Sequence, residues 1–228
     1  MKVKLLNYTS QPEKTVAIAG KRCYSSADNE NLSQKINEEA VAKFIHKLIS
    51  LGHHSALEHA SFTFAAEGIS RVTSHQLVRH RLASYSQQSQ RYVKEDQFDY
   101  VIPPLINEQA SLKNIFDNTM QELQKIYGQF LEAGILPEDA RYVLPNATET
   151  KIIFTMNARE LLHFFRLRCC LRSQWEIIQL ADNMLAEVKK AAPNIFRNAG
   201  PACVYGPCPE GEMTCGKIQE VRMKYKEQ

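Results

Sequence analysis

The segment TKIIFTMNARELLHFFRLR, residues 150–168, sets the architecture expected for this chain. Its first seven residues are rich in β-branched and aromatic side chains, which favours a strand over 150–156. Asn157 then suits the N-cap of a helix, and Glu160 follows three residues later as a capping-box partner. The segment therefore predicts a strand that leads directly into a helix over 158–170.

Hydrophobic periodicity divides the rest of the chain into further helices and short strands. Helices are predicted over 34–50, about 69–81, 107–133, 137–143 and about 173–192. Strands are predicted at 2–8 and at 61–66, the second ending at Gly68, and residues 82–92 are expected to be a polar loop or part strand. We therefore expect an α/β (α+β) fold, with a central, mostly antiparallel sheet flanked by long helices.

The bulk composition is that of an ordinary globular protein. The 228 residues suffice for one well-packed domain, and we expect a single domain over 1–228 with a cysteine-containing tail at about 200–228. No apolar run is long enough to span a bilayer and no secretory signal is visible, so we expect a cytoplasmic protein without a membrane partner. The net charge of only +3 argues against an extended track for nucleic-acid phosphates.

The cysteines and clustered histidines do not predict a metal site. Cys203, Cys208 and Cys215 are not spaced as CxxC pairs and have no clear fourth ligand, so a plain loop or tail is preferred. The histidine-rich turn at 52–59 does not have the HExxH spacing of zinc peptidases. We expect the cysteines to be reduced, and one of the adjacent pair Cys169 and Cys170 to lie in the core.

The most informative polar stretch is RHRLASYSQQSQRY, residues 79–92. It contains three arginines, one histidine, three serines and three glutamines within fourteen residues. Guanidinium forks suit phosphate, whereas hydroxyl and amide groups suit the polar edges of a base or sugar. The stretch contains no glycine, so it is not a glycine-rich phosphate loop. A nucleotide pocket, a basic surface loop and a nucleic-acid contact all fit this composition.

Five residues in this stretch resemble the RHRxxSxxxxS signature of flavin-dependent thymidylate synthases, the ThyX family. They are Arg79, His80, Arg81, Ser84 and Ser89. The segments 53–59 and 157–161 also resemble that family, as does the Leu-Arg pair at 167–168. The resemblance covers about residues 35–195.

The resemblance implies a methyltransferase that converts dUMP to dTMP. FAD is the implied cofactor, and NADPH and 5,10-methylenetetrahydrofolate are the implied co-substrates, with tetrahydrofolate as the folate product and no cysteine nucleophile. It also implies a homotetramer whose active sites form between subunits, with small molecules rather than nucleic acid as partners.

The resemblance also implies roles for individual residues. For dUMP these are Gln76, Arg79, Gln87, Ser89, Gln90, Arg91, Arg141 and Arg168. For FAD they are Ser55, Glu58, Arg79, His80, Arg81, Gln87, Asn157, Arg159 and His163. His53 is a candidate for orienting folate or moving a proton. Position 87 is often acidic in the family, and glutamine there keeps the hydrogen bonding without the charge.

Arg168 is the expected catalytic residue. The resemblance implies that this position helps to ionise N3 of the uracil ring. A fixed cation beside the pyrimidine stabilises negative charge on N3 and the adjacent carbonyls, which makes C5 a better nucleophile.

Two alternatives from other functional classes remain at this point. One is a nucleic-acid-binding module that uses the basic stretch at 79–91. The other is a zinc protein that uses its cysteine-containing tail.

Overall fold

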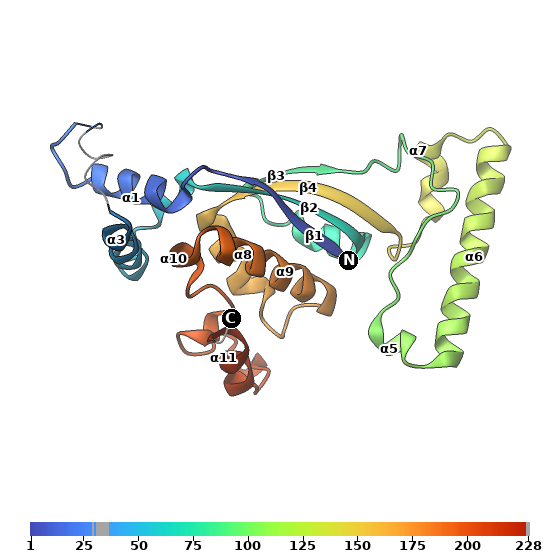
Figure 1. The fold of residues 1–228 in the computed structure, drawn as a ribbon. Helices are drawn as coiled ribbons and strands as arrows, with labels where there is room; N and C mark the ends of the chain where they lie inside the picture. The colour runs from blue at the N-terminus through green and yellow to red at the C-terminus, as the bar shows by residue number, and fades with distance from the viewer. Residues whose placement is uncertain (29, 31–36, 227–228) are drawn as a thin grey trace. The chain divides into compact units, whose positions relative to one another are not determined.

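Four strands form one sheet in the computed structural model, which describes residues 1–28, 30 and 37–226 (Figure 1). They are β1 (Lys2–Tyr8), β2 (Ser61–Ser70), β3 (Ala83–Gln87) and β4 (Glu149–Asn157), in the order β1-β2-β4-β3. Strands β2 and β4 run antiparallel, because Ala158 N donates to Ala60 O (2.7 Å) and Arg71 N donates to Thr148 O (3.1 Å). The expected α/β fold with a mostly antiparallel sheet is confirmed.

Helices account for most of the remaining described residues. The α-helices are α1 (Pro12–Arg22), α3 (Glu38–Ser50), α4 (Arg71–Leu77), α5 (Pro104–Asn107), α6 (Ala110–Glu132), α7 (Pro137–Ala140), α8 (Ala158–Arg168), α9 (Trp175–Ala191), α10 (Pro193–Phe196) and α11 (Ile218–Lys226). Short 3-10 turns are η1 (His54–His59), η2 (Arg141–Val143), η3 (Ala202–Val204) and η4 (Gly211–Met213). None of the described helices is both long and apolar enough to cross a membrane.

Several boundaries differ from the sequence-based prediction. Strand β2 does not end at Gly68 but continues to Ser70, because this glycine adopts a left-handed conformation (φ 68°) within the strand. Helix α4 begins later than expected, at a cap in which Thr73 N donates to Ser70 Oγ (3.2 Å), and it ends at Leu77. Residues 82–92 were expected to be a polar loop or part strand, and Ala83–Gln87 form strand β3, which agrees with the second of these.

The helix predicted over 34–50 is confirmed as α3 for its described part. The Asn37 side chain caps it by accepting from Ala40 N (2.8 Å), and residues 34–36 lie outside the described residues. Helix α1 was not predicted from the sequence. It begins at Pro12, and it buries Val16, Ala17 and Gly20.

The chain separates into two compact units, and their boundaries fall inside each of the four strands and between α4 and β3. The first unit comprises 1–2, 66–79 and 85–153, and the second comprises 3–65, 80–84 and 154–228. A single domain over 1–228 stays a prediction.

Aromatic rings form the centre of the second unit. Phe196 of α10 meets Phe62 of β2 edge to face (centroids 5.3 Å apart), and it meets Phe165 of α8 in the same way (6.1 Å). Phe64 and Phe154 stack between β2 and β4 at 5.5 Å. Figure 1 shows α8, α9 and α10 together on one side of β1, which is the side where this core lies.

The first unit is organised by the long helix α6. Gln124 donates to Phe98 O (2.7 Å), and the Tyr127 hydroxyl accepts from Glu95 N (3.3 Å). The Tyr100 hydroxyl donates to Asp117 (2.9 Å). Helix α6 therefore holds the 95–100 segment, which follows the polar stretch at 79–92.

Removal of the central ring should cost the most stability. We expect Phe196→Ala to lower the free energy of unfolding by about 3–5 kcal/mol, because it leaves a cavity between buried rings. Chemical denaturation measures this change. Met223→Ala is the control in the same unit, because this side chain is 57% exposed, and its effect should stay within about 0.5 kcal/mol. Equal losses in the two variants would contradict this description of the core.

Candidate active site

The residues singled out from the sequence fall into two sets, one in each unit. The first unit contains Gln76, Arg79, Gln87, Ser89, Gln90, Arg91 and Arg141. The second contains His53, Ser55, Glu58, His80, Arg81, Asn157, Arg159, His163 and Arg168. The first set consists only of candidates for dUMP binding, two of which were also expected to touch FAD.

In the first unit, Gln87 is held by two hydroxyl groups. Its Nε2 donates to Ser74 Oγ on α4 (3.0 Å) and to Thr150 Oγ1 on β4 (3.1 Å). The glutamine amide donates in both contacts, whereas an ionised carboxylate could only accept from these hydroxyl groups. The residue that departs from the family pattern therefore has a local structural role.

Arg71 contacts the backbone of the polar stretch at 79–92, and the sequence analysis did not identify this residue. Its Nη2 donates to Gln88 O (3.1 Å), while Gln88 Nε2 donates to Glu95 Oε1 (3.0 Å). Burial lowers the pKa of Arg71, Glu95 opposes that effect, and the positive charge of Arg141 adds to it. A single arginine at the start of a short helix carries no signal in the sequence, so only the fold identifies this contact.

Arg91 and Arg141 both form hydrogen bonds with Glu138. The Arg91 Nε pairs with the Glu138 carboxylate, and the Arg141 Nε donates to the Glu138 backbone oxygen (3.1 Å). Both guanidinium groups are exposed, and the 3-10 turn that follows α7 presents Arg141. The structure thus brings together two of the arginines that the sequence places 50 residues apart.

Two buried nitrogens among the described residues of this unit have no hydrogen-bond partner, Arg71 Nε and Gln90 Nε2. Buried donors are nearly always paired in folded proteins, so each of these calls for an acceptor. A ligand with acceptor oxygens would satisfy them.

The helix predicted over about 69–81 covers Gln76 and Arg79, but only Gln76 lies in α4. Helix α4 ends at Leu77, so Arg79 lies in the turn beyond it, where its backbone N–H donates to Gln76 O (3.3 Å). The Arg79 side chain is exposed.

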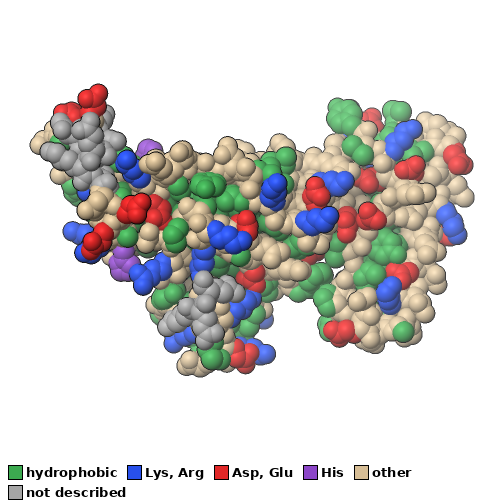
Figure 2. Space-filling view, viewed as in Figure 1, with side chains coloured by type: hydrophobic (Ala, Val, Ile, Leu, Met, Phe, Trp, Pro, Cys, Tyr) green, Lys and Arg blue, Asp and Glu red, His purple; other side chains and the backbone are tan. Residues whose placement is uncertain are grey.

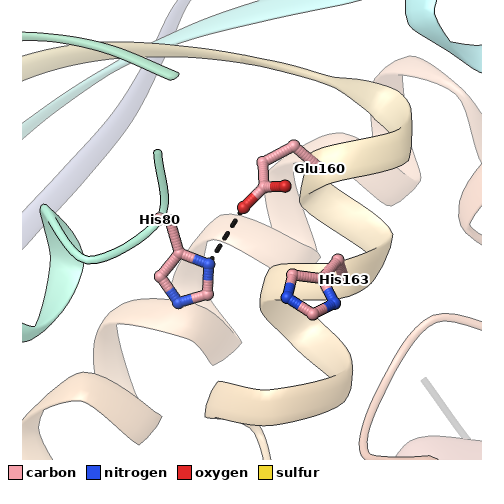
Figure 3. A group of neighbouring side chains, drawn as sticks. All are labelled: His80, Glu160 and His163. Carbon is pink, nitrogen blue, oxygen red and sulfur yellow. Dashed lines mark hydrogen bonds and ion pairs between the residues drawn. The ribbon is translucent and has the colours of Figure 1, made fainter. Parts of the chain in front are cut away.

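In the second unit, His80 is buried and bonded at both ring nitrogens, and Figure 3 shows the contact with Glu160. Its Nδ1 lies 3.0 Å from Glu160 Oε1, and Arg168 Nε donates to its Nε2 at 3.0 Å. Burial is the main reason that the pKa of His80 lies below its ordinary value. The Glu160 carboxylate opposes this shift, and Arg168 adds to it.

Asn157 is confirmed as the N-cap of α8, because its Oδ1 accepts from Glu160 N (2.9 Å). The sequence assigned Glu160 only to this cap. Its carboxylate in fact reaches His80, and a glutamate in the first turn of a helix gives no hint of that contact.

A second group of candidates surrounds an open pocket of about 490 Å³ in the second unit. His53, Ser55 and Arg159 line it, and Glu58 pairs with Arg159 at its edge. The Tyr24 hydroxyl lies 2.6 Å from His53 Nδ1, which fixes that ring at the wall. The size is in the range of sites for organic cofactors.

Arg159 and His163 both belong to α8, but they have different neighbours. Arg159 pairs with Glu58, whereas the His163 ring meets the His80 ring edge-on at 5.9 Å. Both side chains are exposed.

Metal-binding potential is limited to one group among the described residues, His80, Glu160 and His163, whose ligand atoms lie within 4.8 Å of one another (Figure 3). The Arg168 guanidinium donates to a nitrogen of that group, which opposes a second cation. Two cysteines of the tail, Cys203 and Cys208, line a cavity of about 260 Å³ together with Arg168 and Cys170.

Cys169 is a core residue, as the sequence suggested for one of the adjacent pair. Burial raises the pKa of its thiol far above the ordinary range. Because the thiolate is the nucleophilic form, this cysteine is poorly suited to covalent catalysis.

Comparison with known proteins shows the family of the chain. A family model described as thymidylate synthase complementing protein matches residues 4–194. The flavin-dependent thymidylate synthase of Clostridium tetani is 55% identical, with 99% of this chain and 97% of the relative covered. The enzyme of the same name from Geobacter sulfurreducens is 55% identical (100% and 99% covered), and that from Pyrococcus furiosus is 43% identical (99% and 96%).

A solved structure shares the fold. It is the UMP/dUMP methylase PolB from Streptomyces cacaoi bound with 5-Br dUMP, with a TM-score of 0.75 and 24% identity. The alignment covers 86% of this chain and 93% of that chain.

The low pKa of buried His80 predicts a dependence of stability on pH. Below about pH 6.5 the unfolded chain takes up a proton at this residue before the folded chain does, so unfolding becomes easier as the pH falls. One such group contributes at most about 1.4 kcal/mol per pH unit. Denaturation curves at pH 6.5 and 5.5 should therefore show a larger loss for the wild type than for His80→Gln.

His46→Gln is the matched control for this comparison, because His46 is exposed on α3. It should retain the wild-type pH dependence. The same slope in wild type and His80→Gln would show that His80 is not held neutral by its surroundings.

Proposed function

Because this chain belongs to the flavin-dependent thymidylate synthase family, we propose that it methylates dUMP to dTMP. FAD is the proposed form of the flavin, 5,10-methylenetetrahydrofolate the proposed carbon donor and NADPH the proposed reductant, with tetrahydrofolate as a product. Family membership makes the chain a methyltransferase, and the names of its relatives support a flavin cofactor.

The observation that carries the proposal is the fixed guanidinium of Arg168. It is half-buried, and its Nε is bonded to His80, which gives the positive charge a defined position. C5 of uracil is a poor nucleophile until negative charge develops on N3 and the adjacent carbonyls. A preorganised cation at that edge stabilises this charge without having to reorient, which favours attack by C5.

The first unit has features suited to the phosphate and base of dUMP. Arg91 and Arg141 present exposed guanidinium groups at Glu138, and a phosphate would replace the carboxylate partner of Arg91. The buried amide nitrogen of Gln90 has no acceptor among the described residues. With Gln76, Arg79, Gln87, Ser89 and Arg168, these residues make up the proposed dUMP set.

The second unit has features suited to FAD. Ser55 and Arg159 line the pocket of about 490 Å³. The Arg159 guanidinium is exposed near the start of α8, which suits the binding of a pyrophosphate. The proposed FAD set also includes Glu58, Arg79, His80, Arg81, Gln87, Asn157 and His163. When bound, the flavin supplies the hydride chemistry, and the protein supplies position and charge. His53 at the pocket wall is proposed to orient folate or to move a proton.

A homotetramer in the cytoplasm is the proposed form of the enzyme, with active sites drawn from more than one subunit. Helix α6 supports this assembly, because Met120 and Tyr127 are its buried residues while Leu112, Ile115 and Phe130 stay exposed. Exposed apolar side chains along one long helix are typical of a contact surface.

The nucleic-acid alternative is less well supported. The net charge is only +3, and on the face drawn in Figure 2 lysine and arginine side chains are interspersed with acidic ones. Binding to a phosphate backbone favours a continuous basic stripe.

The first experiment tests the cofactor and the substrate together. The purified protein should be yellow, or become so with FAD, and dUMP should accelerate the oxidation of its reduced flavin when 5,10-methylenetetrahydrofolate is present. Absorbance in the flavin bands and chromatography of dTMP measure both. A colourless protein that ignores dUMP, but binds RNA with steep salt dependence, would favour the nucleic-acid reading instead.

Replacement of Arg168 separates catalysis from cofactor binding. We expect Arg168→Ala to retain FAD but to lose at least about 100-fold in kcat, because the preorganised charge is gone. Arg166→Ala is the matched control, since this exposed arginine lies on the same helix and is not among the proposed ligands. Wild-type turnover in Arg168→Ala would remove this residue from the mechanism.

A further inference from the structure

We infer that Glu160 is a positioning residue that acts on Arg168 through His80. In this chain of contacts the carboxylate orients the imidazole, and the imidazole orients the guanidinium that meets the substrate. The inference rests on the proposed function for its catalytic consequence, whereas the contacts themselves can be tested without turnover.

The geometry links two residues that do not contact each other along their own helix. Glu160 and Arg168 lie in the first and last turns of α8, eight residues and roughly 12 Å apart along the axis. His80 comes from a different part of the chain and lies 3.0 Å from each of them. The imidazole of His80 therefore contacts side chains from both ends of α8.

The chemistry of the three groups fixes how the protons are arranged. A guanidinium group only donates, so the Nε2 of His80 must accept the bond from Arg168. The proton of the neutral ring then lies on Nδ1, which donates to the Glu160 carboxylate. Protonation of Nε2, in the other tautomer or in the imidazolium, would place two donors face to face and break the contact with Arg168.

The surroundings hold this arrangement in place. The side chains of His80 and Glu160 are almost fully buried, with exposed fractions of 3% and 6%. The ring of Phe164 packs against His80 edge to face, with centroids 4.8 Å apart. Burial disfavours the imidazolium and strengthens the hydrogen bond to the carboxylate. Because Arg168 is bonded through Nε, the plane of its guanidinium, and so the direction of its terminal nitrogens, follows the orientation of His80.

The direct test of the contacts uses ¹⁵N-histidine NMR on the full-length protein. The chain has seven histidines, and the His80 signal is the one lost in His80→Gln. At pH 7.5 we expect a protonated Nδ1 and an unprotonated Nε2 for this residue. A ring protonated at Nε2 would overturn the inference whatever the enzyme does.

The functional test uses Glu160→Gln with Glu176→Gln as its control. Both glutamates are buried in the first turn of a helix, so the two variants remove a carboxylate from similar settings. We expect Glu160→Gln to lower kcat roughly 10- to 100-fold, because a guanidinium misplaced by about 1 Å no longer meets the developing charge. KM for dUMP should change less than about threefold, flavin should be retained, and the His80 signal should shift from the wild-type pattern.

The control separates positioning from stability. Glu176→Gln should keep kcat within about threefold of the wild type. If Glu160→Gln lowers the melting temperature but turns over at the wild-type rate, Glu160 is only structural and the inference is wrong. If the variant does not fold, the tautomer in the wild type still decides the inference. If the wild-type protein neither holds flavin nor methylates dUMP, the proposed function fails, and the NMR result reports separately on the contacts.

Discussion

In the second unit, the hydrogen bonds at the two nitrogens of His80 hold the side chains of Glu160 and Arg168 in place. A buried imidazole with a carboxylate on one side and a guanidinium on the other has a single favourable proton arrangement. That arrangement ties the turn at 80–84 to α8, because Glu160 and Arg168 both belong to that helix. The same contacts give Arg168 a charge in a fixed place, which a flexible surface arginine would lack. Structure and proposed chemistry therefore depend on the same two bonds.

In the first unit, several cationic side chains lie close to acidic groups. Arg91 and Arg141 converge on Glu138, and Arg71 lies near Glu95. Each carboxylate offsets part of the repulsion between the guanidinium groups. The Gln88 amide and the α6 contacts to the 95–100 segment hold the backbone that presents them. Arg71 Nε and Gln90 Nε2 are buried without an acceptor among the described residues, which is uncommon in a folded protein.

The sequence predicted much of the fold because several signals are local. The β-branched run at 150–156, the Asn157 cap and the apolar stripe at 107–133 correspond to β4, the start of α8 and α6. Local signals were less reliable at boundaries. Gly68 suggests the end of a strand, but β2 continues past it to Ser70, with the glycine at a positive φ. Strand β3 has no apolar alternation, so its pairing in the sheet, and not its composition, makes it a strand.

By itself, the sequence determined the family and the types of residue that would matter, because a signature of fixed spacing survives in the linear order of the chain. The tertiary structure alone decided which of them act together. Glu160 was read as part of a helix cap, yet its carboxylate binds a histidine 80 positions earlier in the chain. Arg71 gave no signal, because its role depends on a backbone oxygen and a carboxylate that are distant in sequence. Side-chain partners at this separation are set by how the strands pair and the helices pack, and spacing along the chain carries no record of that.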